Sequence, residues 1–277
     1  MDLIHHILNL AGLLLWLNWR TAGFAAQRTS SPLLTTLKRT DARRQRWWQL
    51  LALVGLLGAR ALFYWQIGSA VEWIPGLDLR VITLRFRSDF FDRMFLFSIL
   101  SFGWLLAIFY AALLLLSALN GRGAETNPWQ VLLRLHLGWL NPLPGWLKVF
   151  LPVAFTAVAW FATAPLLSRM NLIPPAGHDL KLVQQALLLA LGFVLVWEYA
   201  LIVLLGLHLL NSYVYLGNRP FWGFVHHLGR QTLLPLRGLP LRLHKLDLAP
   251  LLALVIVAAA GHGASLGLTQ LYRLASL

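Results

Sequence analysis

Six long apolar stretches constrain this chain more than any other feature of its sequence. A helix that crosses the ~30 Å hydrocarbon layer of a bilayer needs about 20 mostly apolar residues. The stretches that meet or approach this length are 2–18, 47–66, 93–119, 148–168, 182–211 and 248–272. The chain is 58% hydrophobic, with a mean hydropathy of +0.67, which is more apolar side chain than a soluble core of 277 residues would bury. The sequence therefore predicts an all-α membrane protein with about six transmembrane helices.

The chain is also strongly basic, because 23 Lys and Arg against 10 Asp and Glu give a formal net charge of +13. The cations lie in short segments between apolar stretches, so anionic lipid headgroups are a better partner than nucleic acid. Most of them fall in the connections 20–46, 122–148 and 219–245, and positive connections stay in the cytoplasm. We expect a bacterial inner membrane, or a membrane derived from one, with both termini outside and residues 2–18 retained as a span.

The three basic connections begin alike. In each, a Leu-Asn pair precedes a proline and a basic stretch follows; the prolines are Pro32, Pro128 and Pro220. The order span, interfacial segment, span thus recurs three times, which predicts repeat units at 1–92, 93–180 and 181–277. The alternative is a six-helix protein with ordinary loops, since Leu-Asn pairs are common in a leucine-rich chain.

The third connection begins with a short amphipathic helix. Its two faces carry different residues, with Phe221, Phe224, Val225 and Leu228 opposite His226, His227 and Arg230. We expect the apolar face to contact acyl chains and the segment to lie along the bilayer. Basic side chains here and in the first connection should contact lipid headgroups, namely Arg43, Arg44, Arg46, Arg219, Arg230, Arg242 and Lys245.

Asp247 lies directly before the last apolar stretch, where a helix N-cap is expected. Arg237 comes ten residues earlier, across two prolines, so the chain can fold back and bring the two side chains together. We predict an Arg237–Asp247 ion pair that holds the interfacial segment to the last span. The alternative is a plain N-cap beside a solvated arginine.

The stretch "NRPFWGFVHHLGRQTLLPLRGLPLRLHKLDLAPLLALVI" resembles the signature of the YggT family, also called YlmG. That signature is an Asn-Pro-like start, an amphipathic stretch, a Leu-Leu-x-Pro-Leu-Arg core, a further proline, and Asp-Leu-Ser-Pro opening a span. The matching residues are Pro220, Leu233, Leu234, Pro235, Arg237, Pro240, Asp247, Leu248 and Pro250, with Ala249 in place of the usual serine. The match is confined to about residues 218–257, and three units instead of the usual two depart from the family. The resemblance implies a multi-pass membrane protein without known catalysis, linked to osmotic tolerance or to assembly of membrane complexes.

Three ionisable residues, Arg60, Glu198 and His262, fall inside expected spans at about one depth. One interpretation is an ion or proton path, in which Glu198 contacts the ion and Arg60 is its counter-charge. The other is a structural Arg60–Glu198 pair between the first and third units, with His262 near the outer interface. We favour the structural pair, because a single acidic residue is weak support for a transport path.

We expect no cofactor, no metal and no enzyme activity. A haem held by His5 or His6 together with His262 is geometrically possible. However, the chain has no cysteine and shows no HExxH, P-loop, GxGxxG or GxSxG motif. These absences favour a non-catalytic protein.

Gly263 and Gly267 form a small-x-x-x-small pattern in the last stretch, which allows close approach of another helix, either another span of this chain or a partner protein. We favour packing within the chain. Together with the basic segments, this pattern predicts a structural or assembly component, a subunit held beside other proteins of a larger membrane complex. The competing hypothesis is an ion channel or transporter for osmotic balance, which would need a continuous polar lining.

Overall fold

The computed structural model describes residues 1–28, 42–120, 128–173, 179–214, 217, 219–236, 238, 242–243 and 246–276. Its elements are α1 (Asp2–Arg28), α2 (Ala42–Ala70), β1 (Gly76–Asp78), β2 (Thr83–Arg85), α3 (Phe91–Asn120), α4 (Pro128–Leu137), η1 (Gly138–Leu140), α5 (Gly145–Arg169), α6 (Asp179–Val194), α7 (Val196–Tyr213), α8 (Pro220–Thr232), η2 (Leu234–Leu236), β3 (Arg242–Leu243), β4 (Leu246–Asp247) and α9 (Ala249–Ser276). Of the described residues, 84% are helical, so the all-α prediction is confirmed.

Five described helical segments are long and apolar enough to cross a membrane, which indicates a multi-pass membrane protein. They are Arg46–Ala70, Phe91–Asn120, Gly145–Arg169, Leu180–Tyr213 and Ala249–Leu274. These segments overlap the last five predicted spans. The first predicted span is helical as part of α1, but it is not among the five, so a count of six is not confirmed.

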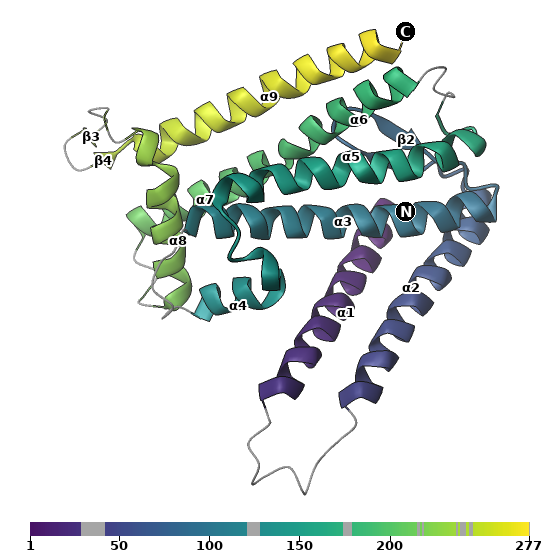
Figure 1. The fold of residues 1–277 in the computed structure, drawn as a ribbon, viewed down its shortest axis with the longest axis horizontal. Helices are drawn as coiled ribbons and strands as arrows, with labels where there is room; N and C mark the ends of the chain where they lie inside the picture. Colours follow the sequence, from purple (N-terminus) through teal and green to yellow (C-terminus); the bar gives the residue numbers. More distant parts are fainter. Residues whose placement is uncertain are drawn as a thin grey trace, which may run out of the picture. The chain divides into compact units, whose positions relative to one another are not determined.

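The chain divides into two compact units, with a boundary inside α3. The first unit comprises residues 1–77 and 84–107, and the second comprises 78–83 and 108–277. In the first unit, α1 and α2 run antiparallel as neighbours (Figure 1). The boundaries of these units differ from those of the three predicted repeats, whose internal similarity stays a prediction.

In the second unit, α5, α6 and α9 lie side by side (Figure 1), and α7 packs on both α8 and α9. Gly229 of α8 lies directly against the His208 ring of α7, where a Cβ atom would clash with the ring. Glycine at this position lets the two helices approach closely.

The short helices α4 and α8 pack on each other and both begin at a proline. Proline is favoured there because the first amides of a helix lack intrahelical partners. The residues after the two prolines, Trp129 and Phe221, also meet, with ring centroids 5.1 Å apart. The core around these helices contains Leu113, Leu114, Leu133, Leu137, Leu204, Phe224, Val225 and Leu228.

The amphipathic pattern of α8 is confirmed, but the partner expected for its apolar face is wrong. Phe224, Val225 and Leu228 are buried against helices of the same unit and do not face acyl chains. Lipid tails are as apolar as leucine, so close packing decides which neighbour an apolar face takes. His226 and His227 are exposed on the other face, as expected.

Candidate functional site

A β-hairpin between α2 and α3 carries Arg80 near its tip. Within the turn, the Leu79 amide donates to the Ile82 carbonyl at 2.9 Å, and the Arg80 amide donates to Asp78 Oδ1 at 2.8 Å. Arg80 has φ of 71°, a conformation that residues other than glycine rarely adopt. The hydrogen-bonded turn therefore holds Arg80 in an unusual backbone conformation, as functional and structural sites often do.

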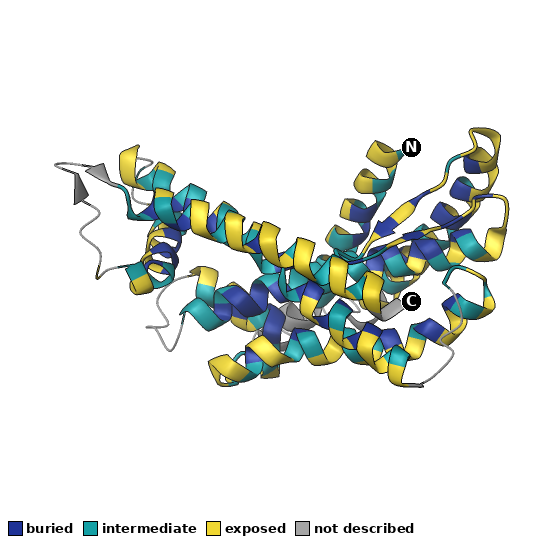
Figure 2. Cartoon of the chain, turned by 90° about the horizontal axis from the view of Figure 1, so that it is seen from above, coloured by how far each residue is buried: buried dark blue, intermediate teal, exposed yellow. Residues whose placement is uncertain are grey.

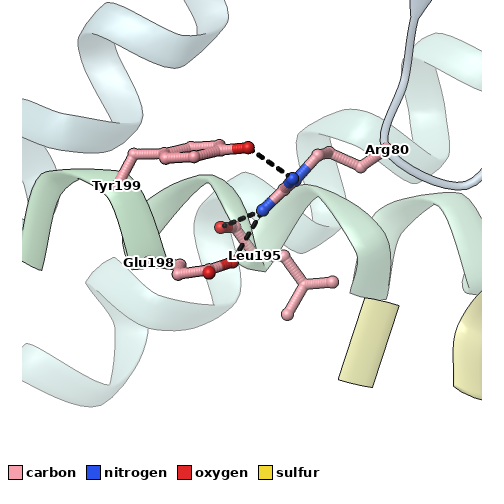
Figure 3. Close-up of polar contacts among 4 residues, drawn as sticks. All are labelled: Arg80, Leu195, Glu198 and Tyr199. Carbon is pink, nitrogen blue, oxygen red and sulfur yellow. Dashed lines mark hydrogen bonds and ion pairs between the residues drawn. The ribbon is translucent and has the colours of Figure 1, made fainter. Parts of the chain in front are cut away.

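The Arg80 guanidinium reaches between two side chains of α7 (Figure 3). Nη2 donates to Glu198 Oε2 at 2.7 Å, and Nη1 donates to the Tyr199 hydroxyl at 2.7 Å. The guanidinium carbon also lies 4.4 Å from the centroid of the Tyr199 ring. Side-chain exposure is 19% for Arg80 and 14% for Glu198, so solvent screens this ion pair far less than a surface pair.

The hairpin docks at an irregular turn between α6 and α7. The Leu195 amide donates to the Gly192 carbonyl and the Glu198 amide donates to the Leu195 carbonyl, each at 3.1 Å, so i→i+3 bonds tighten the helix here. Arg80 Nη2 donates to the same Leu195 carbonyl at 3.4 Å. Gly192 leaves the space that the Val81 side chain occupies, because a Cβ atom there would clash with Val81. Two adjacent hairpin residues thus clamp one turn of the helix.

Glu198 therefore takes a different cation from the expected Arg60, since its ion pair is with Arg80. Gly261 of α9 lies against the Glu198 side chain, so closely that a Cβ atom there would clash. His262 follows Gly261 in α9 and therefore lies at about the same depth as Glu198 of α7. The His262 side chain itself is exposed.

Arg60 lies in the first unit and is 1% exposed. Its Nη1 donates to Asn9 Oδ1 of α1 at 2.5 Å, and its Nη2 donates to the Ser98 carbonyl at 3.2 Å and to Ser101 Oγ at 2.6 Å. Within the described part of the chain Arg60 forms no ion pair. Neutral oxygens of α1 and α3 therefore take the place of water around its charge.

His5 belongs to the same hydrogen-bonded network. Asn9 Nδ2 donates to its Nε2 at 2.9 Å, which leaves the proton on Nδ1 to donate to the Tyr64 hydroxyl at 3.1 Å. The ring also stacks on Phe97, with centroids 5.0 Å apart. Both ring nitrogens are occupied, so neither is available to ligate a haem iron in this structure. His6 is exposed and hydrogen-bonds a backbone carbonyl.

The predicted Arg237–Asp247 pair lies outside the described residues, because Arg237 and the Asp247 side chain are not described. The Asp247 backbone belongs to β4 and pairs with Arg242 of β3. The first helical hydrogen bond of α9 is accepted by the Leu248 carbonyl, so the N-cap falls one residue later than expected. Strand pairing keeps Asp247 extended, which accounts for the shift.

Three of the predicted headgroup contacts, Arg46, Arg219 and Arg230, are exposed. The Arg46 guanidinium carbon also lies 5.4 Å from the centroid of the Trp19 ring. The other predicted contacts fall where side chains are not described, at Arg43, Arg44, Arg242 and Lys245.

Gly263 and Gly267 lie on an exposed part of α9, where a Cβ atom at either position would meet no neighbouring atom. Packing within the chain instead uses Gly261, which contacts α7 through Glu198. The packing of this pattern within the chain that the sequence favoured is therefore wrong, and Gly263 and Gly267 are exposed on the surface of α9.

Among the described residues, no group of three or more His, Asp or Glu side chains could hold a metal ion. No protein-family model, curated protein or solved structure matches this chain. The resemblance to the YggT family gains no support from these comparisons and stays a hypothesis.

Proposed function

We propose that this chain is a non-catalytic membrane protein that serves as a structural or assembly component of a larger membrane complex. The observation that carries the proposal is the exposure of α9. Only 11% of its most apolar window is buried, the smallest share among the five candidate spans, and Figure 2 shows exposed residues along most of the helix. A helix with so few partners in its own chain has a large surface left for others.

The composition of that exposed surface favours a protein partner over lipid alone. Its small residues are Ala259, Ala260, Gly263, Ala264 and Gly267. Such residues allow the backbone of a second helix to come close, which gives packing contacts that fluid lipid tails do not match. The competing channel hypothesis needs Glu198 available to a passing ion, and the pairing of its carboxylate with Arg80 weighs against that role.

Replacing both Gly263 and Gly267 by leucine is expected to release the chain from its complex without unfolding it. The test is size-exclusion chromatography with mass measurement after gentle solubilisation from native membrane, where the wild type should run well above its own 31.2 kDa plus detergent. Gly103→Leu is the matched control, because Gly103 is also exposed and has no neighbour within reach of a Cβ atom. A wild-type chain that runs alone and conducts ions in liposomes would contradict the proposal.

We also propose that α1 is a sixth span. It presents large exposed apolar residues at helical spacing, Leu3, Ile7, Leu10 and Leu14. Its polar residues Asn9 and His5 instead bond within the first unit. A helix divided in this way can span a membrane with its apolar stripe in contact with lipid and its polar side against the first unit.

Six spans and the excess of cations in three connections together predict both termini outside, in a bacterial inner membrane or one derived from it. The chain has no cysteine, so single introduced cysteines report sidedness directly. In intact cells, an added N-terminal cysteine and Ser276→Cys should both react with an impermeant thiol reagent, whereas Thr40→Cys should react only after the membrane is opened. Reaction at only one terminus would instead establish an odd number of crossings.

A further inference from the structure

A polar cavity of about 890 Å³ lies in the second unit, between the end of α3, the helix α4 and the start of α5. This volume is in the range of small-molecule binding sites. Its polar lining combines hydroxyl, amide and cationic side chains, those of Ser117, Asn120, Gln130, Arg134, Asn141 and Lys148. None of the described lining residues is acidic.

Lys148 is the most unusual member of this lining, because it is only 6% exposed. Its Nζ donates to Ser117 Oγ at 2.8 Å, and the Ser117 hydroxyl in turn donates to Asn141 Oδ1 at 2.9 Å. An ammonium group carries three hydrogens, and a hydroxyl oxygen brings no counter-charge. Burial of an ammonium without a counter-ion is unfavourable, so an anion in the cavity would stabilise this arrangement.

The start of α5 adds positive potential at the same place. Its N-cap is Pro144, which offers no side-chain cap, and both Pro144 and Gly145 line the cavity. The N-terminus of a helix carries a partial positive charge that favours anions and disfavours a cation in the first turns. Lys148 lies only three residues after Gly145, so the helix end and the ammonium group reinforce each other at the cavity.

We propose that this cavity binds the phosphate group of an anionic ligand, with Lys148 supplying the counter-charge. The phosphate could belong to a phospholipid headgroup or be free inorganic phosphate, and the recognition chemistry is the same. The cavity lies among α3, α4 and α5 of one chain. Phosphate binding there therefore does not require the chain to be a component of a larger complex.

The first test is ligand binding to lipid-depleted protein in neutral detergent. The probes are short-chain phosphatidylglycerol, phosphatidylcholine of equal chain length, and inorganic phosphate. Phosphatidylglycerol should bind and raise Tm. Phosphatidylcholine should not, because its choline cation cancels the charge of its phosphate and would lie close to Lys148 and Arg134. Lys148→Met should weaken the binding of phosphatidylglycerol at least tenfold. The matched control is Arg169→Met, which removes an exposed cation from the other end of α5 and should change the affinity less than twofold.

The inorganic phosphate probe distinguishes the two sources. If phosphate raises Tm on its own and displaces the lipid, with the same dependence on Lys148, the ligand is free phosphate. If phosphatidylglycerol binds and phosphate does not compete, the ligand is the headgroup. Either result supports an anion site at Lys148.

A second variant keeps the proposal falsifiable if Lys148→Met does not fold. Asn141→Asp preserves the shape of the side chain and places a carboxylate next to Ser117, two hydrogen bonds from Lys148. This built-in anion should raise the Tm of ligand-free protein and reduce phosphatidylglycerol binding at least tenfold. Folded variants that bind phosphatidylglycerol as the wild type does would overturn the proposal.

Glu125 requires its own test, because residues 121–127 lie outside the described part of the chain. Glu125→Gln should leave both the Tm of ligand-free protein and the affinity for phosphatidylglycerol unchanged. If Glu125→Gln lowers the ligand-free Tm, because it leaves Lys148 without a carboxylate partner, the chain neutralises Lys148 itself and the proposal is wrong.

Discussion

Arg80→Ala is expected to destabilise the protein by about 3 kcal/mol, seen as a clear fall in Tm in detergent. The variant leaves the Glu198 carboxylate 14% exposed inside an apolar span without its cation. It also removes the donors to Tyr199 and to the Leu195 carbonyl. Glu198→Ala should lower the stability less, because the Arg80 guanidinium still donates to the Tyr199 hydroxyl and to the Leu195 carbonyl. The double variant should be more stable than Arg80→Ala alone, since it leaves no unpaired charge.

A second ion pair of the chain supplies the matched control. Arg87 and Asp89 approach to the same 2.7 Å, but their side chains are 66% and 49% exposed. Arg87→Ala should change stability by less than about 1 kcal/mol, because water screens the pair and solvates both partners after it is broken. If Arg80→Ala and Arg87→Ala lower Tm equally, or if the effects of Arg80→Ala and Glu198→Ala simply add, the clamp has no energetic role.

The positions of the last five spans could be predicted from the sequence because they depend only on the length and hydropathy of each apolar stretch. A run of about 20 apolar residues can satisfy its backbone polar groups in a bilayer only by forming a helix. The stretch 182–211 illustrates this, since it lies within one apolar helical segment, Leu180–Tyr213, despite the irregular turn at Leu195. Length and hydropathy are enough for such a prediction, and neither depends on which helix is the neighbour.

Partners of buried polar groups depend on turns and neighbours, which hydropathy does not encode. Arg60 and Arg80 both precede Glu198 in the chain, and the choice between them rests on the hairpin turn that aims Arg80 at α7. A local signal for this hairpin exists, because Pro75 and Gly76 precede a short segment, 77–81, in which apolar and polar residues alternate. Such a signal predicts a turn, but it contains no information about which helix the turn will meet.

The same limit explains two further differences. The period of α8 predicts which residues share a face, yet only the fold decides that helices of the same unit, α7 and α4 among them, and not lipid cover that face. Asp247 has the residue type of an N-cap, but its pairing with Arg242 in a two-stranded sheet moves the start of α9 past it. In each case a local preference is correct and a tertiary contact decides its outcome.

Arg60→Met is expected to destabilise the first unit by roughly 3 to 4 kcal/mol, because it leaves three buried acceptors without a charged donor. Those acceptors are Asn9 Oδ1, the Ser98 carbonyl and Ser101 Oγ. Relief from burying the charge offsets part of this loss, but methionine fills the volume without donating a hydrogen bond. Thermal unfolding in detergent measures the total effect, and faster hydrogen exchange in α1 should show that α1 loosens first, since Asn9 connects it to Arg60.

Two further variants separate the lost hydrogen bonds from the lost charge. Arg60→Lys keeps the charge, but one ammonium group cannot reproduce a planar fork that reaches both α1 and α3, so Tm should fall to an intermediate value. The double variant Asn9→Leu with Arg60→Met removes an acceptor together with its donor and should recover stability relative to Arg60→Met alone. Arg46→Met is the control for loss of an exposed cation from the same helix. If Arg60→Met is no less stable than Arg46→Met, water or another group satisfies these acceptors, and Arg60 does not hold α1 to α3.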